Sequence, residues 1–289
     1  MTMRRREFLR TTVGAAGATA VLGGGLRLRG AAPKAAADVI HLGPDRVRLV
    51  RLAIGTGTKG GSVQRQLGIQ GLADMLHFGY DQGLFFWDTA ASYQTHPHVR
   101  EALKRVPREK VTILTKTWVR TAEQMHAELD RFRKELDTDY LDIVLLHAVR
   151  TATWPDERRG AMEALAEAHQ KGLVRTYGVS CHSLEALEAA ANTPWLRVVL
   201  ARINFAGVNM DAEPPAVLPI LRRMKAAGRG VIGMKILGEG VLSNRVDEAL
   251  RFAWSQECVD CFTIGPANRD ELADLIRRIP NASGAAKAA

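Results

Sequence analysis

The chain has 289 residues, 46% of them hydrophobic and 25% charged, so it is long and apolar enough to bury a sizeable core. Its formal net charge is +9, but seven Lys or Arg against one Glu in residues 1–37 account for six of those charges. The rest of the chain has a net charge of only +3, so its charge gives no reason to expect a nucleic-acid partner.

Residues 1–37 have the composition of an export signal. A basic start is followed by a short stretch rich in Ala, Gly, Val and Leu and then by the small-residue run "AAPKAAAD". The stretch is too short and too rich in Gly to span a bilayer, so no stable membrane anchor is expected. The alternative is a basic tail without a role in export.

The run "RRREFLR", Arg4 to Arg10, resembles a twin-arginine signal, in which two Arg, any residue, Phe, Leu and a basic residue follow one another. The resemblance implies export of the folded protein to the periplasm, with the twin-arginine export machinery as a partner. Residues 1–37 are therefore expected to be a signal peptide and spacer.

From residue 38 onwards, short runs rich in Val and Ile alternate with longer amphipathic segments, which is typical of repeated βα units and a parallel sheet. Strands are expected at residues 49–54, 84–87, 111–115, 141–146, 176–179, 198–203, 231–234 and 261–264. Helices are expected at residues 63–79, 98–106, 122–136, 160–172, 184–191, 216–228, 245–257 and 269–279. No linker interrupts the series, so residues 38–289 are expected to form one domain.

Eight βα units predict a closed α/β barrel of the (β/α)8, or TIM, type, although a doubly wound open sheet has a similar periodicity. In such barrels the reacting groups stand at the carboxyl ends of the strands. The residues that follow each strand are therefore the candidates for chemistry.

Ionisable side chains end three consecutive strands. The second strand runs into Asp88, with Tyr93 five residues further on, the third ends in Lys116, and the fourth ends in His147. A buried Lys needs a partner, and Asp88 on the neighbouring strand is the obvious one for Lys116. Taken singly, these residues could be a structural ion pair, a core histidine and a packed phenol, but their common rim indicates a reactive site.

Four segments, "FFWDTAASY", "TILTKTW", "DIVLLHA" and "GVSCH", resemble the ordered signatures of the aldo-keto reductase family over about residues 47–279. The resemblance implies a (β/α)8 barrel and a catalytic tetrad made of Asp88, Tyr93, Lys116 and His147. It also implies a nicotinamide dinucleotide cofactor, usually NADP(H), and a carbonyl or alcohol substrate of low molecular weight.

These residue types suit hydride transfer to a carbonyl, because the carbonyl oxygen gains charge and needs a proton and hydrogen-bond donors. Tyr93 is the expected proton donor. Lys116 is expected to lower the pKa of Tyr93, and Asp88 to keep Lys116 charged. A neutral His147 could donate a hydrogen bond to the same oxygen.

The resemblance extends to the cofactor site with several departures. The expected contacts are Gly55, Thr56, Gly57, Ser180, Arg202, Met234, Lys235, Leu237, Gly265, Asn268 and Arg269. Cys181 stands where the family usually has Asn, and Met234 where many members stack a Tyr on the nicotinamide. Glu271 stands where the family has an Arg that marks NADP, so a clear NADP marker is missing. The resemblance still implies NADP, and NAD remains possible. For Asn268, the alternative is a plain helix cap.

The substrate pocket is expected to include Trp87, His96 and Trp118, which lie in or after segments at the rim. The same residues could instead pack in the core. The sequence does not identify the substrate.

Three cysteines, Cys181, Cys258 and Cys261, are too few for a disulfide framework. "CVDC" has the CxxC spacing, but no second pair completes a zinc site, so no metal is expected. Buried thiols are favoured over a redox or disulfide pair.

The leading hypothesis is an NAD(P)-dependent oxidoreductase that acts on an aldehyde, ketone or sugar. A second is a lyase or isomerase that forms a Schiff base on Lys116. A third, suggested by the departures at Cys181, Met234 and Lys235, is a dinucleotide-binding barrel without turnover.

Overall fold

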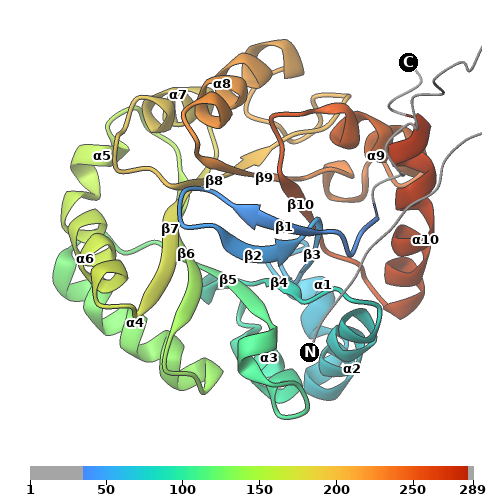
Figure 1. Ribbon diagram of the computed structural model, residues 1–289, viewed down its shortest axis with the longest axis horizontal. Helices are drawn as coiled ribbons and strands as arrows, with labels where there is room; N and C mark the ends of the chain where they lie inside the picture. Colours follow the sequence, from blue (N-terminus) through green and yellow to red (C-terminus); the bar gives the residue numbers. More distant parts are fainter. Residues whose placement is uncertain (1–34, 286–289) are drawn as a thin grey trace, which may run out of the picture. The chain divides into compact units, whose positions relative to one another are not determined.

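The structure is a computed structural model that describes residues 35–285, so nearly all of the expected signal segment lies outside the described residues. Eight parallel strands close into a barrel in the order β10-β3-β4-β5-β6-β7-β8-β9 (Figure 1). The strands are β3 (Leu52–Gly55), β4 (Phe86–Asp88), β5 (Thr112–Thr117), β6 (Leu141–Val149), β7 (Val174–Cys181), β8 (Val198–Arg202), β9 (Gly230–Met234) and β10 (Cys261–Ile264). The predicted (β/α)8 barrel is confirmed, and the open doubly wound sheet is excluded.

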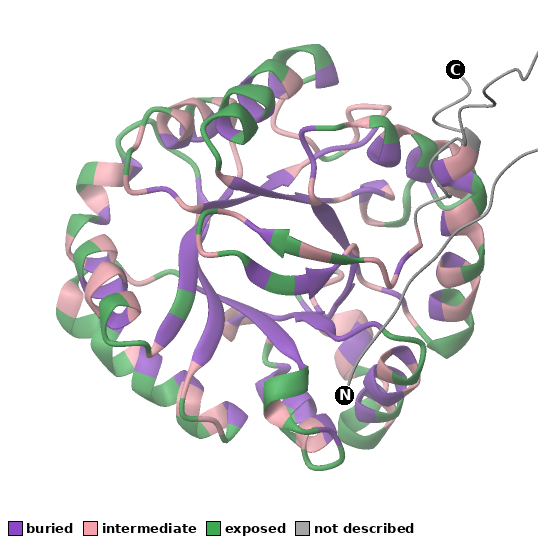
Figure 2. Cartoon of the chain, in the orientation of Figure 1, coloured by how far each residue is buried: buried purple, intermediate pink, exposed green. Residues whose placement is uncertain are grey.

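Helices surround the barrel and bury their inner faces against it (Figure 2). They are α1 (Ser62–Arg65), α2 (Gly68–Asp81), α3 (His96–Leu103), α4 (Ala122–Leu136), α5 (Trp154–Glu157), α6 (Arg159–Gln170), α7 (Leu184–Ala191), α8 (Pro214–Ala226), α9 (Val246–Ser255) and α10 (Arg269–Ala285). Each of the eight expected helices is present. Local sequence fixes their ends, as in α4, where Thr121 and Gln124 form a capping box.

A hairpin that the sequence did not predict covers the amino-terminal end of the barrel. Its strands, β1 (Val39–Leu42) and β2 (Val47–Val50), pair antiparallel and lie across the barrel in Figure 1. Asp45 in the hairpin turn accepts hydrogen bonds from Thr176 at 2.6 Å and from Arg197. The strand expected at 49–54 is therefore two elements, separated at Arg51.

The residues just before the hairpin also pack on the barrel. Ala36 is 2% exposed, and its carbonyl accepts the Leu52 N–H at 3.1 Å. Ala36 was expected to belong to the spacer, but it belongs to the folded barrel.

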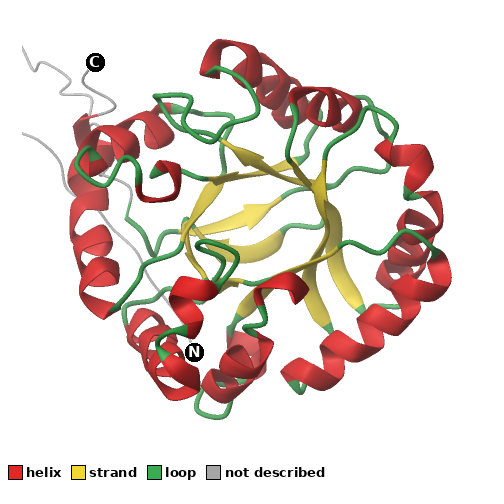
Figure 3. Cartoon of the chain, turned by 180° about the vertical axis from the view of Figure 1, so that it is seen from behind, coloured by secondary structure: helices red, strands yellow, loops and turns green. Residues whose placement is uncertain are grey.

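The opposite end of the barrel carries the loops that follow the strands, and Figure 3 shows it from that side. Strand β6 is irregular there: its register with β7 shifts between Leu146 and Val149, and Ala148 has φ +51°. The Ala148 N–H donates to Ser180 Oγ at 2.8 Å. This bulge fixes the direction of the neighbouring His147.

Within residues 35–285 no helix is both long enough and apolar enough to cross a membrane. The three cysteines are buried free thiols, in agreement with the favoured interpretation of the CxxC segment. Burial raises the pKa of Cys181 and Cys261 well above the usual value of a thiol.

Candidate active site

Asp88 and Lys116 form a buried ion pair at the carboxyl ends of β4 and β5. The Lys116 ammonium donates to Asp88 Oδ1 and to the Thr89 carbonyl, the latter at 2.8 Å. The other oxygen of Asp88, Oδ2, accepts from the Thr263 hydroxyl at 2.9 Å. Lys116 is 1% exposed, and these contacts satisfy a charge that would otherwise be costly to bury.

Tyr93 ends the short 3₁₀ helix η1 (Ala91–Tyr93) in the loop after β4, and its ring lies beside this pair. The Lys116 Nζ atom is 4.8 Å from the ring centroid. Gly57 packs so closely on the ring that a Cβ atom there would lie 2.3 Å from it. Only glycine fits at position 57, which explains the small residue in the turn after β3.

His147 completes the site at the carboxyl end of β6. Its ring centroid is 5.6 Å from that of Tyr93, edge to face, and 5.3 Å from that of Trp118, in a stacked arrangement. Ser92 Oγ lies 3.4 Å from His147 Nδ1. The structure thus brings together the four residues of the predicted tetrad.

The environment sets the charge of each group. Burial raises the pKa of Tyr93 above its usual value, and the Lys116 ammonium opposes that shift only in part. The expected lowering of the Tyr93 pKa is therefore wrong for this structure. Burial and nearby cations, chiefly Lys116, lower the pKa of His147 to about 2, so this ring is neutral near pH 7.

The ammonium of Lys116 remains charged. Burial alone would lower its pKa, but the Asp88 carboxylate and the Tyr93 phenol raise the pKa above the usual value. The pair therefore places one fixed positive charge beside the phenol.

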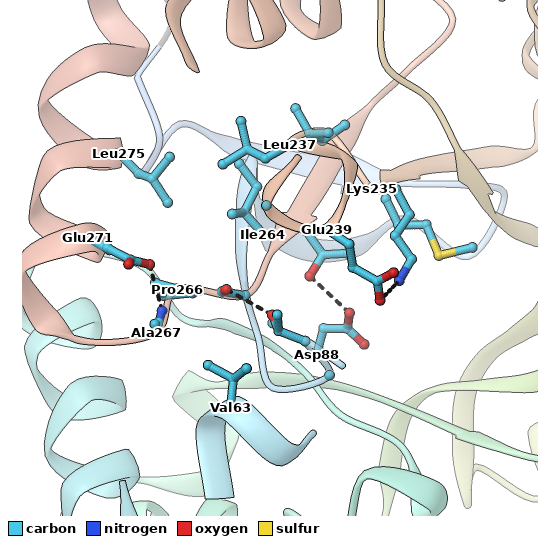
Figure 4. A pocket seen from close by; sticks show the side chains of 18 of the residues that line it. Val63, Asp88, Lys235, Leu237, Glu239, Ile264, Pro266, Ala267, Glu271 and Leu275 are labelled. Carbon is cyan, nitrogen blue, oxygen red and sulfur yellow. Dashed lines mark hydrogen bonds and ion pairs between the residues drawn. The ribbon is translucent and has the colours of Figure 1, made fainter. Parts of the chain in front are cut away.

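A cavity of about 500 Å³ runs from Asp88 and Tyr93 to the first turns of α10 (Figure 4). Its walls come from the loops after β3, β9 and β10. Six of the expected cofactor contacts line it: Gly55, Gly57, Met234, Lys235, Leu237 and Gly265.

Three other expected contacts, Thr56, Ser180 and Arg202, do not line the cavity and are bound to other parts of the protein. Thr56 Oγ1 donates to the Asp88 carbonyl at 3.0 Å, and Ser180 accepts from Ala148. Arg202 is bound to His182 Nδ1 at 2.5 Å and to Asp211 at 3.2 Å. Each of these side chains already has a partner in the protein, and none lines the cavity.

Two further expected contacts, at the start of α10, point elsewhere. Asn268 Oδ1 accepts the Glu271 N–H at 2.9 Å, so Asn268 caps the helix, as the alternative interpretation held. The Arg269 guanidinium lies 4.3 Å above the Phe78 ring. Neither side chain lines the cavity, and α10 presents Glu271 and Asp274 to it instead.

Among the expected substrate residues only Trp118 reaches solvent at the site. Its side chain is 57% exposed and lines a second hollow with Lys116 and His147. Trp87 is fully buried, because neighbours in a strand point to opposite faces and Asp88 faces the interior of the barrel. His96 is 2% exposed and hydrogen-bonds Thr115 and Glu135, so both expectations are corrected to core positions.

The main cavity suits a dinucleotide. Its lining reaches from Asp88 and Tyr93 of the tetrad to α10, and Lys59 brings a positive charge that suits phosphates. No group of three or more His, Cys, Asp or Glu side chains within residues 35–285 is arranged to hold a metal ion.

Sequence reasoning missed several residues of the site. Thr263, Glu239 and Asp274 all line the cavity. Thr263 could have been found, because a polar residue inside the buried strand "CFTI" needs a partner. Glu239 could not, because a left-handed turn at φ +60° brings it back to Lys235.

The neutral histidines predict a pH dependence of stability. Burial lowers the pKa of His147 to about 2 and that of His182 to about 3, from 6.5. Below about pH 6.5 the unfolded chain binds protons that the folded chain cannot bind. The free energy of unfolding should therefore decrease as the pH is lowered below about 6.5, by up to about 1.4 kcal/mol per pH unit for each histidine. Asp211, whose pKa burial raises to about 6, acts in the opposite sense.

Urea unfolding of the wild type and of His147→Gln measures this effect. The measurements should run from about pH 7.5 to about pH 5, the interval over which the unfolding free energy begins to depend on pH. In the variant, the dependence of the unfolding free energy on pH should be weaker by about the contribution of one histidine. The exposed His126 provides the control, since His126→Gln should leave the slope unchanged. Equal slopes for wild type and His147→Gln would contradict a buried neutral His147.

The barrel and the four groups at its carboxyl end define the class: an α/β barrel with a buried acid–base site beside an elongated cavity. The sequence profile of the Aldo/keto reductase family matches residues 51–279. The chain belongs to this family.

Curated relatives agree with this assignment, and a solved structure has the same fold. The chain is 27% identical over 177 residues to an aldo-keto reductase of Bombyx mori, covering 56% of each chain. It is 32% identical over 112 residues to the methylglyoxal reductase DkgB of Salmonella typhi, covering 36% of this chain and 40% of that one. The chain spans about half the length of these curated relatives. A Pseudomonas aeruginosa structure matches with a TM-score of 0.74 at 22% identity, covering 86% and 98% of the two chains, which supports the fold.

Proposed function

We propose that this protein is an NAD(P)(H)-dependent oxidoreductase that interconverts a carbonyl compound and the corresponding alcohol. One observation carries the proposal: Tyr93 stands between a charged Lys116 and a neutral His147 at one end of the elongated cavity. A dinucleotide bound there would supply the hydride.

In the direction of reduction, the carbonyl oxygen gains negative charge and needs a proton. Burial keeps the pKa of Tyr93 above its usual value, so the phenol holds a proton near pH 7 and donates it to that oxygen. His147 is neutral and can donate a hydrogen bond from its ring. Lys116 stabilises the phenolate that Tyr93 leaves behind, and Asp88 holds Lys116 in place.

The substrate would enter beside Trp118, which stacks on His147 and is open to solvent. An exposed aromatic stacked on His147 favours a small carbonyl compound with an apolar part. The Salmonella relative is named for methylglyoxal, which makes small oxoaldehydes the first substrates to test.

The test is a set of carbonyl compounds offered with NADH and with NADPH: methylglyoxal, an aromatic aldehyde and an aldose. Oxidation of either dinucleotide with formation of the alcohol would support the proposal. Binding of a dinucleotide without turnover across the set would indicate instead a barrel that only holds the cofactor. A chain that binds neither dinucleotide would overturn the proposal.

The Schiff-base alternative is disfavoured by the state of Lys116. An amine must be neutral to attack a carbonyl, whereas Lys116 is held charged by Asp88 and is 1% exposed. Borohydride reduction in the presence of the same carbonyl compounds should leave no covalent adduct on Lys116. An adduct at that residue would favour the lyase.

We also propose export by the twin-arginine pathway, motivated by the run Arg4 to Arg10. Changing Arg5 and Arg6 to Lys should leave the folded protein in the cytoplasm, because the pathway reads the arginine pair. Cell fractionation measures this, and the paired change of Arg27 and Arg29 to Lys is the matched control. An unchanged periplasmic yield of the Arg5/Arg6 variant would refute the assignment.

A further inference from the structure

The end of the cavity farthest from the tetrad is acidic. Helix α10 presents Glu271, Asp274 and Leu275 to it, and Figure 4 shows Glu271 and Leu275 on the opposite side of the pocket from Asp88. The reacting end of a dinucleotide must lie near Tyr93, because the proton donor and the hydride act on the same carbonyl group. The adenosine end then lies against α10.

The charges at this end belong to two carboxylates. Asp274 is bound by Arg277 and Arg278, neither of which lines the cavity. Glu271 Oε2 accepts the Ala267 N–H at 2.7 Å, and no ion pair to Glu271 occurs among residues 35–285. Glu271 therefore presents a carboxylate that no cationic side chain of the described residues pairs with.

No cation from α10 offsets it inside the cavity. Arg269, which precedes Glu271 by two residues, stacks on Phe78 outside the cavity. The two lysines of the lining, Lys59 and Lys235, come from the loops after β3 and β9, and Lys235 is bound to Glu239. Lys59, which has no ion pair among residues 35–285, is the cation available to the two phosphates that NAD and NADP share.

The two cofactors differ at the adenosine ribose. NADP carries a 2′-phosphate with a charge near −2 at neutral pH, which a carboxylate repels. NAD carries hydroxyl groups there, which can donate hydrogen bonds to a carboxylate. In other dinucleotide sites an acidic residue that binds the ribose hydroxyl selects NAD. In sites that take NADP, an arginine accommodates the 2′-phosphate instead.

We propose that Glu271 makes the cavity selective for NAD(H) over NADP(H). The inference rests on the proposed function, since it concerns the same cavity and the same cofactor class. It reverses the preference for NADP that the family resemblance implies.

Binding of NAD⁺ and NADP⁺ to the full chain, measured by calorimetry without substrate, tests the proposal. The wild type should bind NAD⁺ about tenfold or more tightly than NADP⁺. Glu271→Gln keeps an oxygen for the Ala267 N–H and removes the charge, so the preference should narrow by about threefold or more. Glu271→Arg should reverse the preference, mainly through tighter binding of NADP⁺.

The matched control is Glu185, an exposed glutamate in the first turn of α7. Glu185→Gln and Glu185→Arg make the same charge changes and should leave both dissociation constants within about twofold. A wild type that binds NADP⁺ as tightly as NAD⁺, or variants at Glu271 that match those at Glu185, would overturn the inference and leave the oxidoreductase proposal intact. A wild type that binds neither dinucleotide would overturn both.

Discussion

Replacing Tyr93 by Phe should lower the turnover of the best carbonyl substrate by about 100 to 10,000-fold, the usual contribution of a positioned proton donor. The ring stays, so its contacts with Gly57, Lys116 and His147 should persist. Only the hydroxyl is lost. Dissociation constants for NAD⁺ and NADP⁺ should therefore change by no more than about twofold, since this change removes an interaction with the transition state.

Single-turnover measurements with saturating dinucleotide separate the chemical step from product release. The control is Tyr80→Phe on α2, which removes a phenol from a helix that lies outside the site. Turnover of Tyr93→Phe close to that of Tyr80→Phe would exclude Tyr93 as the proton donor.

The barrel and the tetrad could be predicted from the sequence because both depend on order along the chain. Eight apolar runs of strand length recur with amphipathic segments between them, and a parallel barrel places every strand end at the same rim. Asp88, Lys116 and His147 follow three consecutive strands, so the fold alone brings them together. Tyr93 follows Asp88 by five residues in the loop after β4, and the resemblance to the family, not the fold alone, placed it in the tetrad.

Whether a side chain of a strand or helix points to the core or to the site depends on which face of the element it occupies. Trp87 and Asp88 are adjacent in a strand, so only one of them can face the barrel interior. The sequence already contained that constraint, and it could have placed Trp87 in the core. His96 gave no such signal, because its partners, Thr115 and Glu135, come from two other elements.

The expected cofactor contacts that do not line the cavity have one feature in common. Ser180, Arg202 and Arg269 were expected to bind a ligand from their places along the chain, but each has a partner inside the protein. Such pairings depend on residues far apart in sequence. The shift in the Tyr93 pKa was missed for a related reason: a sequence names the nearby cation, Lys116, but not the extent of burial that outweighs it.

Breaking the buried ion pair should destabilise the protein more than any other single change at the site. Asp88→Asn leaves the Lys116 ammonium 1% exposed and without a counter-ion, which should cost about 3–5 kcal/mol in the free energy of unfolding. Lys116→Met leaves the Asp88 carboxylate with the Thr263 hydroxyl as its remaining side-chain partner and should cost a similar amount. Urea unfolding near pH 7 measures both. Turnover should fall by at least about 100-fold in Lys116→Met, because Tyr93 loses the charge that stabilises its phenolate.

The double variant, Asp88→Asn with Lys116→Met, separates stability from catalysis. It leaves no unpaired charge in the barrel, so it should be destabilised by less than the sum of the two single changes, and by less than either one if the site repacks well. Turnover should not recover, because Tyr93 still lacks its cation. Glu188→Gln, which breaks the exposed pair with Arg223, is the control and should cost no more than about 1 kcal/mol. Additive losses in the double variant would show that Asp88 and Lys116 do not act as a pair, and recovered turnover would show that the pair serves the fold alone.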